Sequence, residues 1–308
     1  CSVFVLIGGW FLCEQPYKTR RPLSLWLSLW LYTVPVTLLC RLAGLDVSLG
    51  ALRWAAFPAS TRQLWFISDY LVLLLCVPLL NRLLHGLPRR AHKGVLLVLA
   101  VPLVLYPTLF GQDGILADTA WMFLYDYLLA AYLRRWPDNR LSQFLNRPAA
   151  ALALGLGLPL ANTAVRAVLE WQGATDSKAF QYIAYYRTAL GALPGLLAAL
   201  ALFHFFKNWD LGSNRVVNAL AGTTLGVYIL HQVPVLRDFL WNGIFHAQAH
   251  HGSAGYTLLV IVLTFAGCAA IDALRTKFIM QPLQRSRAFT ALCAKGDALA
   301  AEIAKPND

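Results

Sequence analysis

Long apolar runs alternate with short polar connections along almost the whole chain. Because a helix that crosses a bilayer needs about 20 mostly apolar residues, this pattern predicts eight complete membrane-spanning helices. Their expected ranges are 23–43, 64–85, 94–111, 117–133, 149–169, 181–206, 216–236 and 255–275. A ninth run at 2–13 is too short to cross, so we expect it to be the end of a helix that begins upstream of Cys1. The predicted fold is an all-α, polytopic transmembrane helical bundle.

The basic residues fall mainly in every second connection between these runs. Most of the 26 Lys and Arg residues lie around 18–21, 82–93, 134–147 and 207–215 and in the tail after 275. Cytoplasmic loops of membrane proteins are enriched in Lys and Arg, so we expect these connections to face the cytoplasm. The connections at 44–63 and 237–254 are then expected on the outer side.

Composition supports a membrane protein and argues against a nucleic-acid-binding protein. The chain is 58% hydrophobic and 13% charged, whereas soluble domains carry about 25% charged residues. Its net charge of +11 lies in short loops and forms no recognisable nucleic-acid-binding module. We expect one membrane domain at 1–275 and an amphipathic cytoplasmic tail at 276–308. The six Cys residues show no metal-binding spacing, so no metal site is predicted.

Ionisable side chains inside the spans are the first candidates for a functional site, because burying them in a bilayer is costly. Asp69 and Tyr70 lie in the outer half of span 64–85, and Asp126 lies in the middle of span 117–133. His231 and Arg187 lie in two later spans. A structural ion pair between Asp126 and Arg187 is an equally good interpretation of those two residues.

Arg20 and Arg21 lie in the first basic connection and have two interpretations. They fix the orientation of the following helix, or they bind phosphate, for which the planar guanidinium group is well suited. The chain contains no Gly-rich phosphate loop ending in Lys-Ser/Thr, no Gly-x-Ser-x-Gly and no His-Glu-x-x-His. From the residues alone, a transporter and a membrane-embedded transferase both remain open.

The segments Phe4–Leu12, Leu64–Leu71 and Gly226–Gln232, taken together, resemble the acyltransferase-3 family of integral membrane acyltransferases. Phe4–Leu12 (FVLIGGWFL), followed by a basic loop, resembles a Phe-x-Leu-Ser-Gly-Tyr-Phe-Leu stretch in the second helix of that family. Leu64–Leu71 (LWFISDYL), continuing to Pro78–Leu80, resembles its Leu-Trp-Phe-x-x-x-Tyr…Pro-Leu-Leu helix. Gly226–Gln232 (GVYILHQ) resembles a late Gly-x-Tyr-Leu-x-His motif. The order of the segments and the topology extend the resemblance over nearly the whole chain.

The chain departs from the family pattern at two points. Gly8 and Trp10 replace the usual Ser and Tyr of the first segment. In addition, the first helix of the family carries an Arg and a His that is the presumed catalytic base, and this helix would precede Cys1. The resemblance therefore implies ten spans in the full-length protein, and it assigns the catalytic role to no residue of this chain.

The resemblance implies transfer of an acyl group, expected to be acetyl, from acyl-CoA to a hydroxyl of a cell-surface or lipid-linked carbohydrate. Acyl-CoA would be a co-substrate, and no bound cofactor is expected. Arg20 and Arg21 match the basic loop of the family and are expected to bind the CoA phosphates. Trp65, Tyr70 and His231, expected toward the opposite face, would orient the acceptor or polarise a carbonyl.

The expected location is the bacterial inner membrane, where lipid and the glycan or glycolipid acceptor would be the partners. Two alternatives remain. One is a transporter or flippase of a lipid-linked saccharide, in which Asp126 and Arg187 would line the passage. The other is an inactive, truncated acyltransferase.

Overall fold

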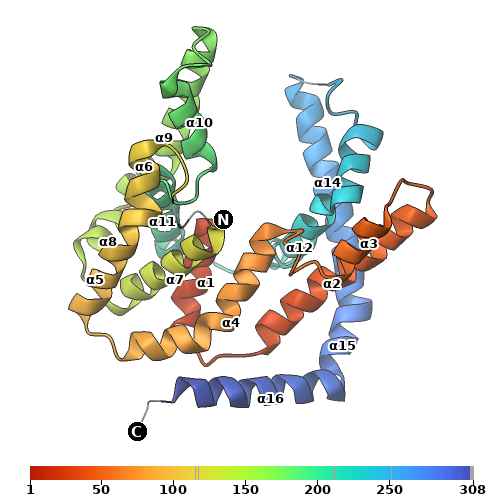
Figure 1. Ribbon diagram of the computed structural model, residues 1–308, viewed down its shortest axis with the longest axis horizontal. Helices are drawn as coiled ribbons and strands as arrows, with labels where there is room; N and C mark the ends of the chain where they lie inside the picture. Colours follow the sequence, from red (N-terminus) through yellow and green to blue (C-terminus); the bar gives the residue numbers. More distant parts are fainter. Residues whose placement is uncertain (115, 117, 211, 251, 306–308) are drawn as a thin grey trace. The chain divides into compact units, whose positions relative to one another are not determined.

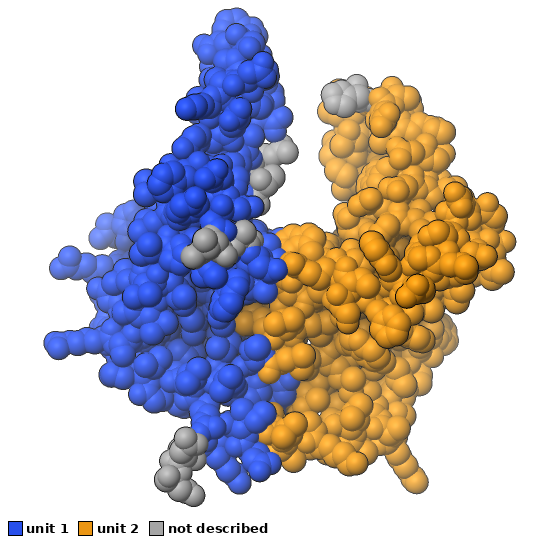
Figure 2. Space-filling model, in the orientation of Figure 1, with its two compact units in different colours: residues 1–17, 76–211, 301–308 blue, residues 18–75, 212–300 orange. Residues whose placement is uncertain are grey.

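The computed structural model describes residues 1–114, 116, 118–210, 212–250 and 252–305, and every regular element within these ranges is helical (Figure 1). The chain divides into two compact units (Figure 2). Unit 1 comprises residues 1–17, 76–211 and 301–308, and unit 2 comprises residues 18–75 and 212–300. Helix α4 (Trp65–His85) begins in unit 2 and ends in unit 1.

Unit 1 is built around α7 (Thr119–Arg135), which is buried over most of its length. α1 packs against α7, and α9 packs against α11. The other helices of this unit are α1 (Ser2–Leu12), α5 (Arg89–Ala100), η1 (Val101–Leu105), α6 (Tyr106–Phe110), α8 (Arg140–Leu145), α9 (Pro148–Trp171), α10 (Lys178–Thr188) and α11 (Leu193–Asn208).

Unit 2 is organised around an apolar cluster that joins α2 (Arg20–Leu42), the first half of α4, α12 (Arg215–Gln232) and α14 (Ala254–Arg275). Leu29, Ile67, Ile229 and Cys268 contribute one buried side chain from each of these helices. The remaining helices are α3 (Leu49–Ala56), α13 (Pro234–Asp238), η2 (Phe239–Ile244), η3 (Thr276–Met280), α15 (Gln281–Arg285) and α16 (Arg287–Ala304).

The connection after α2 folds back along that helix. Ser48 caps the start of α3 by accepting a hydrogen bond from the backbone N–H of Ala51. At the other end of α3, the buried Thr33 hydroxyl of α2 donates to the Ala55 carbonyl over 2.9 Å. α3 thus returns to the middle of α2, and α4 begins beside this level, with Leu64 and Ile67 in the same cluster as Leu29.

Five helices among the described residues are long and apolar enough to cross a membrane. They cover Arg20–Leu42, Trp65–His85, Arg89–Phe110, Pro148–Trp171 and Ala254–Arg285. A sixth span results if Arg215–Gln232 and Pro234–Ile244, which meet at 78°, count as one. The chain is therefore an all-helical, multi-pass membrane protein, but the predicted number of eight complete spans is not reproduced.

Three predicted spans account for this difference. α7 has 17 residues, which is short for a crossing, and its burial within unit 1 leaves little of it for lipid. The predicted span 181–206 is interrupted between α10 and α11, where Ala189 adopts an extended conformation. Gly191 is needed in this interruption because a Cβ there would lie 2.2 Å from the Leu103 carbonyl oxygen. In the predicted span 216–236, the bend falls at Val233 and Pro234.

Helical structure continues across the expected start of the tail at residue 276. The helical span that starts at Ala254 continues to Arg285, so the expected boundary at 275 falls inside it. An extended residue, Ser286, then separates α15 from α16. α16 buries Phe289, Cys293 and Ala300. It is the part of the tail that forms a helix separate from the span Ala254–Arg285.

Candidate functional site

Six of the eight predicted site residues belong to unit 2, and two belong to unit 1. The residues in unit 2 are Arg20 and Arg21 of α2, Trp65, Asp69 and Tyr70 of α4, and His231 of α12. Those in unit 1 are Asp126 of α7 and Arg187 of α10. The structure thus gathers Leu64–Leu71 of the second family-like segment, the third segment and Arg20 and Arg21 in one compact unit, whereas Pro78–Leu80 belongs to unit 1.

Aromatic contacts connect the two segments within unit 2. The Phe66 ring stacks on Tyr70 at a centroid distance of 6.1 Å and meets the edge of Trp65 at 6.0 Å. Across to α12, Phe66 contacts Tyr228 at 5.9 Å, and Tyr228 contacts His231 at 6.2 Å. Phe66 and Tyr228 therefore bridge the predicted site residues of α4 and α12.

Arg21 is close enough to Tyr70 for its charge to act on the phenol. Both side chains are partly buried. The expectation that these two residues lie toward opposite faces of the membrane stays a prediction.

The His231 ring has a defined orientation. Its Nδ1 atom lies 2.6 Å from the Val227 carbonyl oxygen, one helical turn earlier. A carbonyl oxygen only accepts hydrogen bonds, so Nδ1 carries a proton. In the neutral ring, Nε2 then holds the lone pair and can accept a hydrogen bond from a hydroxyl. This property suits a residue that orients the acceptor of a transfer reaction.

Asp69 is engaged in an ion pair. Its carboxylate lies 2.8 Å from Nη2 of Arg62, and the Asp69 side chain is 5% exposed. Arg62 has a φ of 49°, in the left-handed region that non-glycine residues rarely adopt. The pair therefore holds the turn before α4, which is a structural task that the sequence pattern did not indicate.

The start of α2 contacts the last helices of the chain. Arg20 donates to Oε1 of Gln284 over 2.8 Å, and Gln284 donates to the Ser24 hydroxyl over 2.9 Å. The backbone N–H of Thr19 donates to Oδ1 of Asp297 over 2.6 Å. Gln284 therefore orients Arg20 while the Arg20 side chain remains exposed.

A groove of about 460 Å³ lies at the start of α2, where Thr19 and Pro22, the sequence neighbours of Arg20 and Arg21, line it. Thr19, Pro22 and Trp26 line it from α2 and the residue before it. Ser68 and Leu71 of α4 and Leu292 of α16 complete most of the wall. The groove is mainly apolar, with hydroxyl-bearing residues at Thr19, Ser60 and Ser68.

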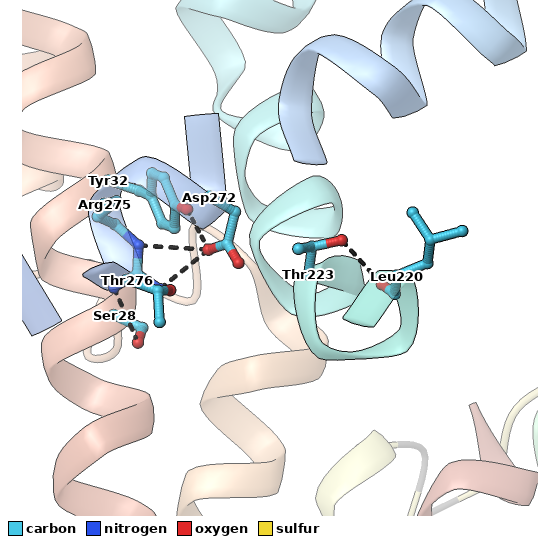
Figure 3. A network of polar contacts seen from close by, with 7 residues as sticks. All are labelled: Ser28, Tyr32, Leu220, Thr223, Asp272, Arg275 and Thr276. Carbon is cyan, nitrogen blue, oxygen red and sulfur yellow. Dashed lines mark hydrogen bonds and ion pairs between the residues drawn. The ribbon is translucent and has the colours of Figure 1, made fainter. Parts of the chain in front are cut away.

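A buried polar network in unit 2 has no counterpart among the predicted site residues (Figure 3). Tyr32 donates to Oδ1 of Asp272, and Arg275 donates to the same oxygen over 2.9 Å. The Arg275 guanidinium also lies 4.7 Å from the centre of the Tyr32 ring and 3.4 Å from the Ser28 hydroxyl. The sequence signal was a lone Asp near the end of an apolar run, which did not reveal partners on α2.

Asp272 also explains the first residue of the third family-like segment. A Cβ at Gly226 would lie 2.1 Å from Oδ1 of Asp272. Only glycine leaves room for the carboxylate at this crossing of α12 and α14. The Gly of GVYILHQ therefore serves the network, and the His of the same segment remains available for a ligand.

Asp126 in unit 1 is fully buried beside the Ser2 side chain of α1. Neither carboxylate oxygen has a hydrogen-bond partner of ordinary geometry within the described part of the chain. The Arg187 side chain lies outside the described residues, so the predicted pair of Asp126 and Arg187 stays a prediction.

The first family-like segment forms α1 in unit 1. Its Trp10 ring lies between two cations, with Arg134 at 5.0 Å and Lys207 at 4.9 Å from its centre. Trp10 also packs against Phe203 at 5.5 Å. These contacts give Trp10, the residue that differs from the family pattern, a role in holding α1, α7 and α11 together.

Comparison with known proteins gives one match. The family model described as an acyltransferase domain matches residues 2–273, which include all three segments and all eight predicted site residues. No curated protein and no solved structure matches the chain.

Proposed function

Because the chain belongs to the acyltransferase-3 family, we propose that it moves an acyl group, acetyl in the simplest case, from acyl-CoA to a hydroxyl of a cell-surface or lipid-linked carbohydrate. The observation that carries this proposal is the arrangement in unit 2. There, Arg21, a cation suited to phosphate, belongs to the same compact unit as Tyr70, and aromatic contacts lead from Tyr70 to His231.

The donor would bind at the start of α2. Arg20 and Arg21 supply positive charge for the CoA phosphates, and Arg geometry favours paired hydrogen bonds to phosphate oxygens. The adjoining groove of about 460 Å³ offers an apolar wall for the extended part of the donor, with the Ser68 hydroxyl as a polar contact. The pairing of Arg20 with Gln284 would orient one guanidinium toward the donor before it arrives.

The acceptor would lie near His231. In the reaction, the acceptor hydroxyl gives up its proton as its oxygen attacks the thioester carbonyl carbon. The C–S bond breaks, and the CoA sulfur takes up a proton and leaves as a thiol. Nε2 of neutral His231 can accept a hydrogen bond from the acceptor hydroxyl and so fix its direction of approach. We assign His231 this positioning role, and we assign the general base to no residue of this chain.

The proposed location is a bacterial inner membrane, with the basic connections in the cytoplasm where acyl-CoA is made. This orientation follows from the distribution of Lys and Arg. It places the donor arginines on the side that supplies acyl-CoA.

The test uses purified full-length protein with labelled acetyl-CoA and glycan or glycolipid fractions. Label transferred to a carbohydrate fraction supports the proposal. Replacing Arg20 and Arg21 with Ala should weaken CoA binding, whereas the matched Arg285→Ala/Arg287→Ala protein, which also lacks two exposed arginines, should bind CoA normally. Unchanged CoA binding in the Arg20→Ala/Arg21→Ala protein would remove those residues from the donor site. Transport of a lipid-linked saccharide without any transfer of label would instead favour the flippase.

A further inference from the structure

Unit 1 contains a cleft of about 660 Å³ that the proposed reaction does not use. It lies between α5 and α7 and is closed on a third side by residues 138–141 at the start of α8. Its lining has two parts. The basic part consists of Arg89, Arg90, Lys93 and Arg140, and the apolar part consists of Leu96, Leu97, Leu129, Leu133 and Leu141 with Tyr125 and Tyr132.

The basic part carries excess positive charge. Arg89 is paired with Asp138, whose carboxylate lies 2.7 Å from Nη1. Within the described ranges, Arg90, Lys93 and Arg140 form no ion pair. The carboxylate of Asp138, the acidic residue of the lining, is already paired with Arg89. Arg90, Lys93 and Arg140 therefore repel one another, so an anion that binds between them is favoured.

The apolar part opens toward the lipid-facing side of α5. Leu96 is buried, whereas Leu97 is 60% exposed and Val98 is 71% exposed. In a helix of a membrane protein, such exposed apolar residues face acyl chains. The basic residues lie at the end of α5 that the distribution of Lys and Arg places in the cytoplasm. The cleft therefore runs from the level of the headgroups into the depth of the hydrocarbon.

We propose that this cleft binds one anionic phospholipid of the cytoplasmic leaflet. Its phosphate would lie between Arg90, Lys93 and Arg140, and an acyl chain would cover Leu96, Leu97 and Leu129. A free phosphate would satisfy the cations but leave the leucine wall uncovered, and this mismatch favours an amphiphile that reaches the cleft from the bilayer. The inference does not depend on the proposed acyl transfer.

The test measures lipid that is retained by the purified protein. The protein is reconstituted in phosphatidylcholine containing phosphatidylglycerol, extracted with mild detergent and analysed by native mass spectrometry. The Arg90→Gln/Lys93→Gln/Arg140→Gln protein should retain at least about tenfold less phosphatidylglycerol, because each basic residue near an anionic lipid contributes attraction. The matched control Arg285→Gln/Arg287→Gln/Lys295→Gln loses the same charge from exposed positions of the tail and should retain phosphatidylglycerol within about twofold of the unchanged protein.

A second variant tests the apolar part of the cleft by itself, and it also tests whether the loss of lipid in the triple variant comes from misfolding. Leu97→Trp leaves all charges in place and adds bulk at an exposed wall position, so it should fold normally and still reduce phosphatidylglycerol retention. Equal loss in the triple variant and its control would overturn the proposal. Displacement of phosphatidylglycerol by inorganic phosphate would show a free-anion site, and displacement by acyl-CoA would show a donor site; either result would also overturn it.

Discussion

The carboxylate of Asp272 fills the space that a side chain at position 226 would need. A Cβ on Gly226 would stand 2.1 Å from Oδ1 of Asp272, well inside the distance that any pair of heavy atoms without a bond can adopt. This crossing lies in the family-like segment that carries His231, so the packing residue Gly226 and the proposed positioning residue His231 lie within one segment of seven residues.

Replacing Gly226 with Ala should therefore destabilise the protein. The added methyl group must push Asp272 away from Tyr32 and Arg275, and overpacking of this kind typically costs about 1–3 kcal/mol. Thermal unfolding in detergent would measure the effect. The matched control is Gly222→Ala on the same helix, where no atom lies within 4 Å of the added Cβ, and it should be neutral or stabilising. Similar destabilisation by both variants would show that the helix backbone, and not Asp272, is responsible.

The Tyr32 hydroxyl should matter less than the Asp272 carboxylate. Tyr32→Phe removes one hydrogen bond to a charged group, which is worth about 1.5–3 kcal/mol. Asp272→Ala leaves Arg275, whose side chain is only 10% exposed, without its carboxylate, and breaking a buried pair in this way costs about 3–5 kcal/mol. Combining Asp272→Ala with Gly226→Ala should cost less than the sum of the two changes, because the clash disappears. Strict additivity in thermal unfolding would argue against the contact.

His231 should affect the acceptor more than the donor. His231→Ala removes the Nε2 acceptor, and a lost hydrogen bond to substrate predicts a fall of roughly tenfold in kcat/KM for the acceptor. KM for acyl-CoA should stay nearly constant. His231→Gln, which restores a side-chain oxygen at similar reach, should recover part of the activity. A rise in the KM for acyl-CoA alone would place His231 at the donor instead.

Asp138 should limit how strongly the cleft of unit 1 attracts anions. Arg89 donates a hydrogen bond to this carboxylate and keeps its pKa below the usual value of 3.8. Because its pKa is lowered, Asp138 is charged at any pH above its usual pKa of 3.8. It releases Arg89 only when the pH falls below that value and the carboxylate is protonated. Retention of phosphatidylglycerol should thus show no Asp138-dependent change between about pH 5 and pH 8.

Asp138→Asn should free Arg89 and raise phosphatidylglycerol retention by up to about fivefold. The control Asp46→Asn removes the same charge from an exposed position in the connection expected on the outer side and should have no effect. A loss of retention in Asp138→Asn would mean that Arg89 has to be held by Asp138 to contact the lipid.

Hydropathy predicted the helical, multi-pass character of the chain because a bilayer selects for length and apolarity within each segment. It did not predict the interruption before α11, since a window average does not register that Gly191 lies against the Leu103 carbonyl. The return of α3 along α2 was missed for a related reason. The buried hydrogen bond that fixes it, from Thr33 to Ala55, joins residues whose types are common in any helix.

Some residues of the candidate site could be identified from sequence because they lie in short, recognisable segments. Arg21, Tyr70 and His231 were identified from local segments, and the structure places them in one unit. The network around Asp272 was not, because Tyr32 and Asp272 are 240 positions apart and nothing in either neighbourhood marks the other as a partner. Contacts across such separations arise from the packing of whole helices, which no local pattern encodes.

The composition of unit 2 from two distant stretches, 18–75 and 212–300, has a consequence for biogenesis. The ribosome makes α2 and the first half of α4 long before it makes α12, α14 and α16. Until residues 212–300 are made, the apolar faces of α2 and α4 and the Arg20 side chain contact lipid or the insertion machinery. Residues 76–205, by contrast, follow one another closely and contain most of unit 1. Unit 2 can therefore assemble only after residues 212–300 are made, and a nascent chain stalled before position 212 would hold most of unit 1 but would lack α12 and α14 of unit 2.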